Sequence, residues 1–167
     1  MARRALFLDR DGTVIVDTGY PRDPRSVQLL DGAIAAMKEA RDLGYALIVV
    51  SNQSGVARGI ITPEQLASVH SRMVDLLAAE GVVLDGAYYC THGPDDGCIC
   101  RKPRPGLIVD AAREHQFDLA ASLLVGDKAS DVAAGEAAGC ASFQLGTWVE
   151  ALAWVRARSR GIGGRNG

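Results

Sequence analysis

The chain has 167 residues, of which 48% are hydrophobic and 23% are charged, and its formal net charge at pH 7 is −2. This size and apolar share predict a single globular domain with a full core, which we expect over residues 1–155, ahead of a flexible Gly- and Arg-rich tail over 156–167. The balanced charge argues against a basic face for nucleic acid, and no apolar run approaches the roughly 18 residues that a membrane span needs.

The first residues of the chain bear on its location. Met1–Arg4 leads into only about five apolar residues before Asp9, too few for the hydrophobic region of a secretory signal. We therefore expect a cytoplasmic protein, in which cysteines serve more often as metal ligands or catalytic groups than as disulfide partners.

Strand-like apolar runs alternate with helix-like segments along the chain. Ala46–Val50 is a continuous apolar run of the kind that is buried on both faces of a parallel sheet. Asp31 is expected to cap a helix that Gly44 ends, and Thr62 with Gln65 forms a capping box for the next helix. The predicted strands are 5–8, 46–50, 87–90, 122–126 and 141–145, and the predicted helices are 31–43, 63–80, 106–115, 130–138 and 149–157.

This alternation predicts an α/β fold with a doubly wound, mainly parallel sheet of five or more strands and helices on both faces. No inserted stretch is long enough to form a large cap domain. In such folds ligands bind outside the carboxyl ends of the strands, so the residues that follow each strand are the candidates for function.

Asp9-Arg10-Asp11-Gly12-Thr13 follows directly on the first predicted strand. Residues i and i+2 of a strand point to the same side, so both carboxylates should reach one small space at the sheet edge. Gly12 allows a sharp turn or a close approach of the backbone to a ligand. Paired carboxylates can divide a reaction, one attacking and the other moving a proton. In isolation, the same pattern is equally compatible with a solvated acidic turn.

Polar residues follow other strands in the same way. Ser51 ends the second strand, Lys102 lies before the third helix, and Asp127 ends the fourth strand. With Asp9 and Asp11, Asp127 would form a hard oxygen site, which Mg²⁺ prefers, while the hydroxyl and the cation could hold phosphoryl oxygens. Singly, Ser51 is typical of a turn, Lys102 of a solvated surface and Asp127 of a helix cap. Their joint occurrence at successive strand ends favours phosphoryl transfer.

Three of the four cysteines lie in one short segment with the pattern C-x-H-x5-C-x-C, formed by Cys90, His92, Cys98 and Cys100. Four such ligands predict a closed, tetrahedral Zn²⁺ site with no open position for catalysis; the alternative is two incidental pairs of buried thiols. Arg101 and Lys102 follow Cys100 directly, so zinc would fix both cations over a substrate. Cys140 is expected to be a small core residue.

The ordered motifs D-x-D-G-T, S-N-Q-S-G, R-K-P and G-D-K-x-x-D resemble the four motifs of the haloacid dehalogenase superfamily of phosphohydrolases, over residues 5–147. Within it, the chain resembles the capless histidinol-phosphate and heptose-bisphosphate phosphatases. Residues 17–20, 51–59 and 127–128 are more similar to the branch that acts on heptose 1,7-bisphosphate. The gap between His92 and Cys98 is short, as is common in histidinol phosphatases, so this feature does not favour the heptose-bisphosphate branch.

The resemblance implies a Mg²⁺-dependent phosphatase that forms an aspartyl phosphate on Asp9, with Asp11 as its acid and base. It implies that Mg²⁺ is held by the Asp9 carboxylate, the Asp11 backbone carbonyl and Asp127, with Asp131 orienting this group. It also implies a structural Zn²⁺ on the cysteine segment. The implied phosphoryl-binding residues are Ser51 and Lys102, and the implied substrate-binding residues are Asp17, Thr18, Gly19, Tyr20, Asn52, Gln53, Ser54, Arg101 and Lys128.

The implied substrate is a small phosphorylated sugar, D-glycero-D-manno-heptose 1,7-bisphosphate, which would lose its 7-phosphate in heptose biosynthesis for lipopolysaccharide or another glycan. The enzyme is expected to act as a monomer, without a nucleic-acid or membrane partner. Histidinol phosphate is the alternative substrate. Its amine calls for an extra acid, whereas a second phosphate calls for cations, which this chain supplies as Arg58, Arg101, Arg104 and Lys128.

Two alternatives lie outside the enzyme class. A phospho-accepting receiver domain of a signalling protein also combines acids, a hydroxyl, a lysine and Mg²⁺. Receivers, however, carry the accepting Asp on the middle strand, which here is predicted to end in Ser51-Asn52. A catalytically inactive, zinc-stapled binding module is disfavoured because all the reactive residues are present.

Overall fold

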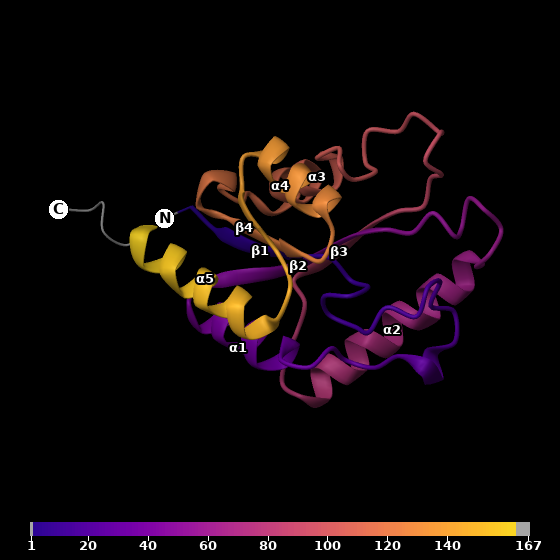
Figure 1. The fold of residues 1–167 in the computed structure, drawn as a ribbon, viewed down its shortest axis with the longest axis horizontal. Helices are drawn as coiled ribbons and strands as arrows, with labels where there is room; N and C mark the ends of the chain where they lie inside the picture. The colour runs from indigo at the N-terminus through magenta and orange to yellow at the C-terminus, as the bar shows by residue number, and fades with distance from the viewer. Residues whose placement is uncertain (1, 163–167) are drawn as a thin grey trace.

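The computed structural model describes residues 2–162, which form a five-stranded parallel sheet between two layers of helices (Figure 1). The strands are β1 (Arg4–Leu8), β2 (Tyr45–Asn52), β3 (Gly86–Cys90), β4 (Leu123–Gly126) and β5 (Ala141–Gln144). The α-helices are α1 (Ala33–Asp42), α2 (Pro63–Ala79), α3 (Gly106–His115), α4 (Ala129–Ala138) and α5 (Trp148–Ile162). Short 3-10 turns span Pro24–Ser26 and Leu119–Ala121. The predicted α/β fold is confirmed.

The sheet has the order β3-β2-β1-β4-β5, and every neighbouring pair is parallel. The chain winds from β1 to one edge and then crosses back to the other side, which makes the gap between β1 and β4 the point where ligands bind in such sheets. The middle strand is therefore β1, which leads into Asp9, and the prediction that it ends in Ser51-Asn52 is wrong. Chain order does not fix lateral order, so strand position does not separate this fold from receiver domains.

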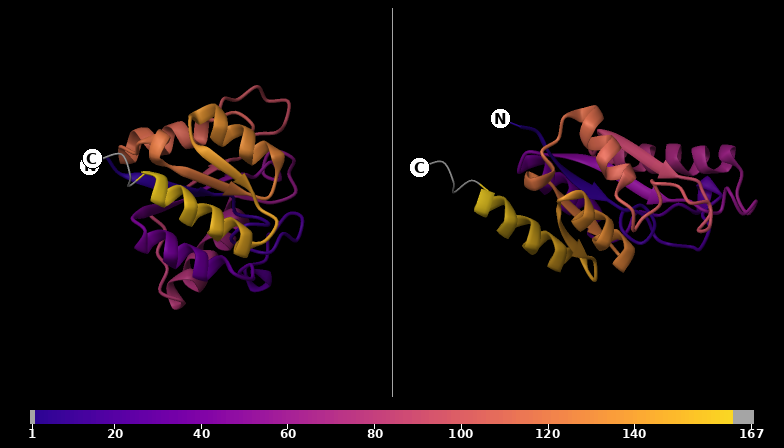
Figure 2. Two further views of the ribbon diagram at one scale, coloured as in Figure 1. Left: turned by 60° about the vertical axis from the view of Figure 1, so that its left-hand side comes forward. Right: turned by 90° about the horizontal axis from the view of Figure 1, so that it is seen from above.

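Both faces of the sheet are covered. Helices α1, α2 and α5 pack on one face, and α3 and α4 on the other (Figures 1 and 2). Along β1, Leu6 and Leu8 belong to the first layer of the core, and Ala5 and Phe7 to the second. A strand buried on both sides has no polar positions, which explains the unbroken apolar runs in the sequence.

The two predicted helix starts have different outcomes. The capping box of α2 is confirmed: the Gln65 amide N–H donates to Thr62 Oγ1 at 3.1 Å, and the Thr62 N–H donates to Gln65 Oε1 at 2.9 Å. Helix α1 instead begins after Gly32, whose φ of 83° is left-handed, and the predicted cap at Asp31 is wrong. A Cβ at position 32 would lie 2.8 Å from Trp148 Cβ, so packing against α5 selects glycine there.

The predicted flexible tail over 156–167 is wrong as far as Ile162, because α5 continues to that residue. Arg156 pairs with Glu39 of α1, and Ser159 Oγ donates to the Tyr45 hydroxyl at 3.1 Å. These contacts hold the last turns of α5 against the sheet. Residues 163–167 lie outside the described part of the chain. None of the helices within residues 2–162 combines the length and apolar character needed to pass through a bilayer.

Candidate active site

The carboxyl ends of β1, β2 and β4 surround a small pocket. Its lining residues are Asp9, Asp11, Ser51, Asn52, Lys102, Lys128, Ser130 and Asp131. The Asp9 N–H still donates to the Val125 carbonyl at 3.2 Å, which ties the start of the loop to β4. The structure therefore brings seven predicted site residues together at this pocket, and Ser130 is an eighth lining residue that was not predicted. The roles of the seven stay predictions.

Lys102 is the cation at the centre of the pocket, and it is only 4% exposed. Its Nζ donates to Asp9 Oδ1 at 2.9 Å, to Asp131 Oδ1 at 2.6 Å and to the Val50 carbonyl at 2.8 Å. Burial alone would lower the pKa of Lys102, but the charges of Asp9 and Asp131 outweigh it, and the pKa is raised. Lys102 is therefore a fixed positive charge beside Asp9.

Asn52 holds the backbone of Lys102. The Lys102 N–H donates to Asn52 Oδ1 at 2.9 Å, and Asn52 Nδ2 donates to the Lys102 carbonyl at 3.0 Å. This two-way amide contact fixes the segment that follows the cysteine cluster against the end of β2. The side chain predicted to read the substrate is thus already engaged within the protein.

Three carboxylates meet beside Lys102. Oxygens of Asp9, Asp127 and Asp131 all lie within 4.8 Å of one another. Asp127 Oδ1 is buried without a hydrogen-bond partner, and burial, followed by the neighbouring Asp9, raises the pKa of Asp127 to about 6. Three acids against two lysines, Lys102 and Lys128, still leave an excess of negative charge, and an unpaired buried oxygen is costly.

This donor set fits Mg²⁺, which prefers carboxylate oxygens. Asp9 and Asp127 have oxygens left to bind it, whereas both oxygens of Asp131 are used, by Lys102 Nζ and by the Lys128 N–H at 3.0 Å. That use suits the predicted orienting role of Asp131. Gly12 has a φ of 80°, and a Cβ there would lie 2.3 Å from Asp127 Oδ2, so only glycine leaves room for this carboxylate.

Asp11 lies in a network of N–H donors. Arg10 donates from Nε to Asp11 Oδ1 at 2.7 Å and from a terminal nitrogen to Oδ2 at 3.2 Å. Gln53 Nε2 donates both to Asp11 Oδ2 at 3.1 Å and to Ser51 Oγ at 2.9 Å. Because Ser51 Oγ accepts this bond, its own O–H remains available as a donor to a ligand.

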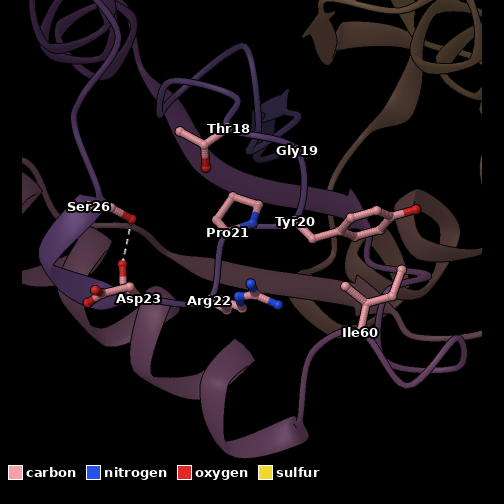
Figure 3. A pocket seen from close by; sticks show the side chains of 8 residues that line it. All are labelled: Thr18, Gly19, Tyr20, Pro21, Arg22, Asp23, Ser26 and Ile60. Atoms are coloured by element: carbon pink, nitrogen blue, oxygen red, sulfur yellow. Dashed lines mark hydrogen bonds between the residues drawn. The ribbon is translucent and has the colours of Figure 1, made fainter.

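The loop over residues 17–20 lies at a different cavity (Figure 3). That cavity is lined by Thr18, Gly19, Tyr20, Pro21, Arg22, Asp23, Ser26 and Ile60, none of which lines the strand-end pocket. Asp17 accepts the Gly19 N–H at 2.9 Å, so its carboxylate closes the local turn. The Tyr20 ring packs close to Gly55, where a Cβ would come within 2.7 Å of it. The structure does not join this loop to the pocket, and its role in substrate binding stays a prediction.

The predicted zinc ligands come together at the end of β3. Cys90, His92, Cys98 and Cys100 each place one ligand atom within 4.8 Å of all the others. The sulfur atoms of Cys90 and Cys100 are 3.0 Å apart and those of Cys90 and Cys98 are 3.7 Å apart, too far for disulfides. A tetrahedral ion with Zn–S bonds of about 2.3 Å separates its ligand atoms by about 3.7 Å. The cluster is therefore consistent with structural zinc.

Comparison with known proteins agrees with this geometry. A family model described as HAD-hydrolase-like matches residues 99–160. The D-glycero-beta-D-manno-heptose-1,7-bisphosphate 7-phosphatase of Photorhabdus laumondii is 48% identical over 137 residues, which cover 78% of this chain and 73% of that protein. The enzyme of the same name from Escherichia coli K12 is 45% identical, covering 80% of this chain and 74% of its own. This chain belongs to the haloacid dehalogenase-like phosphatases.

Solved structures of this phosphatase family match across nearly the whole chain. A putative HAD-like phosphatase from Mesorhizobium loti superposes with a TM-score of 0.84 at 34% identity, covering 99% of this chain and 90% of that one. The D,D-heptose 1,7-bisphosphate phosphatase of B. bronchiseptica, solved with magnesium and phosphate, gives 0.81 at 34% identity, covering 95% and 97%. The phosphatase fold is therefore shared along nearly the whole chain.

Arg10 contacts the site of this phosphatase but, like Ser130, is not among the residues that the motifs predict. Strand alternation would place it opposite Asp9 and Asp11, yet its guanidinium lies against Asp11. The strand ends at Leu8, and the Arg10 carbonyl accepts the N–H groups of residues 13, 14 and 15, so alternation no longer applies. A charged residue directly between two acids was the available signal.

We expect the purified phosphatase to carry one zinc ion per chain and Cys100→Ser to lose it. Because Arg101 and Lys102 follow Cys100, the loss should displace both cations and lower kcat/KM by about 100-fold, while the core of the sheet stays folded. Elemental analysis and kinetics measure this. Cys140→Ala, which changes a buried cysteine outside the cluster, should keep both zinc and activity. Full zinc content and activity in Cys100→Ser would contradict the assignment.

Proposed function

We propose that this chain is a Mg²⁺-dependent phosphatase that removes the 7-phosphate of D-glycero-D-manno-heptose 1,7-bisphosphate. The observation that carries the proposal is the group of Asp9, Asp127 and Lys102 at the switch point of the sheet. The substrate is supported by the names of relatives that are 45–48% identical over about four-fifths of the chain.

In the first half of the reaction, an Asp9 carboxylate oxygen attacks phosphorus and the bond from phosphorus to the sugar oxygen breaks. Asp11 gives its proton to the departing oxygen, which leaves as the alcohol. A carboxylate is ionised at neutral pH, so Asp9 needs no base to activate it. The Asp9 position suits this role because Lys102 Nζ lies 2.9 Å from one of its oxygens and steadies the side chain.

In the second half, water attacks phosphorus and the bond to Asp9 breaks, returning the electron pair to that carboxylate. Asp11 takes the proton of the attacking water and is restored as the acid. The sum is ester plus water giving alcohol plus inorganic phosphate. Through both halves, the Ser51 O–H would donate to a phosphoryl oxygen. Lys102, whose three N–H groups already donate to Asp9, Asp131 and the Val50 carbonyl, would act on the phosphoryl oxygens through its positive charge.

Mg²⁺, held by Asp9 and Asp127, would neutralise charge on the phosphoryl group and orient it for in-line attack. The unpaired Asp127 Oδ1 is the atom that supports this placement. The backbone carbonyl of Asp11 is proposed as a further ligand on the family resemblance alone.

The second phosphate of the substrate would meet cations at the rim of the pocket. Lys128 is exposed and lines the pocket, and Arg101 has a buried terminal nitrogen without a partner. Asn52 and Gln53, proposed as substrate contacts, are already bonded to Lys102, Ser51 and Asp11, so they would act on the substrate mainly by holding those groups. The active species is proposed to be the monomer, which gel filtration measures.

The deciding experiment compares kcat/KM for heptose 1,7-bisphosphate, as both anomers, with kcat/KM for histidinol phosphate. We expect the bisphosphate to be preferred by about 100-fold or more, since a second phosphate adds charge-assisted bonds that the amine substrate lacks. The β anomer, named in the relatives, should be the better substrate. Equal or faster hydrolysis of histidinol phosphate would contradict the proposed substrate but not the proposed phosphatase reaction.

A further inference from the structure

Arg10 is a charged side chain with no access to solvent. It is 0% exposed, one of its terminal nitrogens has no partner, and Asp11 is the acid with which it pairs among the described residues. Burial would lower the pKa of Arg10, but the bonds and charge of Asp11 outweigh this and raise it, so the guanidinium stays ionised. Burying a charge is expensive unless it is paired, so this arrangement calls for a reason.

Arg10 and Asp11 form a bidentate ion pair. Nε faces one carboxylate oxygen at 2.7 Å and a terminal nitrogen faces the other at 3.2 Å, so the guanidinium plane fixes the carboxylate plane. Gln53 adds a third donor at 3.1 Å. Rotation about the last bond of Asp11 would break these contacts, so its orientation is set by its neighbours rather than by its own rotamer preference.

Arg10 is in turn supported from behind. Its guanidinium carbon lies 5.6 Å from the centre of the Tyr89 ring, on β3. The Tyr89 hydroxyl lies 2.7 Å from His70 Nδ1, on α2, and the two rings meet edge to face at 5.5 Å. Burial raises the pKa of Tyr89 to about 12 and lowers the pKa of His70. The Tyr89 hydroxyl and the neutral His70 imidazole therefore share a hydrogen bond, which holds the ring under Arg10 in place.

We propose that Arg10 is a positioning residue for the proton-transferring carboxylate of Asp11, and that Tyr89 and His70 hold Arg10 in place from β3 and α2. The proposal rests on the proposed phosphatase function. Each of the two carboxylates then has its own buried cation: Lys102 steadies Asp9, which attacks, and Arg10 orients Asp11, which moves the proton. Arginine suits the second task because a lysine offers a point charge and not a planar fork.

The test separates proton transfer from attack by changing the leaving group. A p-nitrophenolate ion leaves without a proton, so the first turnover of p-nitrophenyl phosphate does not need Asp11 as an acid. For Arg10→Lys and Arg10→Met, kcat on the sugar bisphosphate should fall by about 100-fold, with KM changed less than about threefold. The first-turnover release of p-nitrophenol, measured by rapid mixing, should stay close to that of the wild type.

Two results would overturn the role of Arg10. Wild-type kcat in Arg10→Lys would mean that charge alone suffices, and an equal loss in the p-nitrophenol first turnover would mean general collapse of the site. A crystal structure of Arg10→Lys tests the proposal independently of enzyme activity. The Asp11 side chain should occupy more than one orientation in it, and a single unchanged orientation would refute the proposal. If the wild type hydrolyses no phosphomonoester, the proposed function fails while this structural reading still decides the positioning of Asp11.

Tyr89→Phe tests the support from β3 and α2, and it keeps the ring under Arg10 while removing the bond to His70. We expect kcat on the sugar bisphosphate to fall by about three- to tenfold at constant KM, since the effect is indirect. Tyr88→Phe is the matched control. Tyr88 is the adjacent residue of the same strand, and its hydroxyl bonds Glu114 and His115 instead. Equal kcat values in the two variants would remove Tyr89 and His70 from the proposal.

Discussion

Asp9→Asn is expected to abolish phosphate release, lowering kcat by about 10⁴-fold or more, and to leave the fold as stable as before. The amide is a poor nucleophile and a poor metal ligand, so both proposed roles of Asp9 are lost. The carboxylate of Asp127 cannot replace Asp9 as the nucleophile, because it would have to bind Mg²⁺ and attack phosphorus at the same time. Steady-state phosphate release measures the loss.

The stability of this variant follows from the charges around it. Lys102 loses one partner but keeps Asp131 at 2.6 Å and the Val50 carbonyl at 2.8 Å. Asp127, whose pKa is raised to about 6 by burial and then by Asp9, is relieved of a repelling neighbour. The melting temperature of the metal-free variant should equal or exceed that of the wild type, and the gain on adding Mg²⁺ should shrink.

The matched control is Asp110→Asn, which removes a half-buried carboxylate of α3 that pairs with Arg113. It should change neither phosphate release nor the gain in melting temperature with Mg²⁺. Near-normal turnover in Asp9→Asn would remove that residue from its role. A fall of several degrees in its metal-free melting temperature would show instead that Asp9 is needed to balance Lys102.

The meeting of polar side chains at the strand ends could be predicted because it depends on local rules. Parallel strands bring their carboxyl ends to one edge, so the residues that follow Leu8, Val50 and Gly126 had to meet there. The cluster of three cysteines and one histidine follows from residue type and spacing. The capping box at Thr62 is local in the same sense, since both of its bonds join residues three apart.

The contacts that escaped prediction are those made across long stretches of chain. The clasp between Asn52 and Lys102 joins residues 50 apart, and the bond from Gln53 to Asp11 joins residues 42 apart. The composition of the Arg-rich segment predicts a flexible tail. In the structure, however, Arg156 pairs with Glu39 and the segment is helical as far as Ile162. Tertiary contacts of this kind override local pattern, and nothing in the segment itself encodes them.

Lys102→Met is expected to lower the free energy of unfolding in metal-free buffer by about 3 to 5 kcal/mol, because it strands a group of buried carboxylates without their cation. For a chain of this size, that corresponds to a fall in melting temperature of about 10 °C. Asp9, Asp127 and Asp131 would then face one another within 4.8 Å. Added Mg²⁺ should restore more stability to this variant than to the wild type, since it replaces the missing positive charge.

Lys128→Met separates the effect of burial from that of charge in the same pocket, because Lys128 is exposed whereas Lys102 is only 4% exposed. Its melting temperature should stay within about 2 °C of the wild type, as for ordinary surface substitutions.

The loss of stability in Lys102→Met should also depend on pH. Burial and Asp9 raise the folded pKa of Asp127 to about 6, above its usual 3.8, so its contribution to stability is fully present below about pH 4 and is lost as pH rises through 6. Without Lys102, ionised Asp127 should destabilise the folded protein more, because less positive charge opposes its negative charge. The difference in melting temperature between variant and wild type should therefore be larger at pH 8 than at pH 5. A difference that is independent of pH and of Mg²⁺ would mean that Lys102 stabilises the fold by packing its side chain, and not by balancing the carboxylates around it.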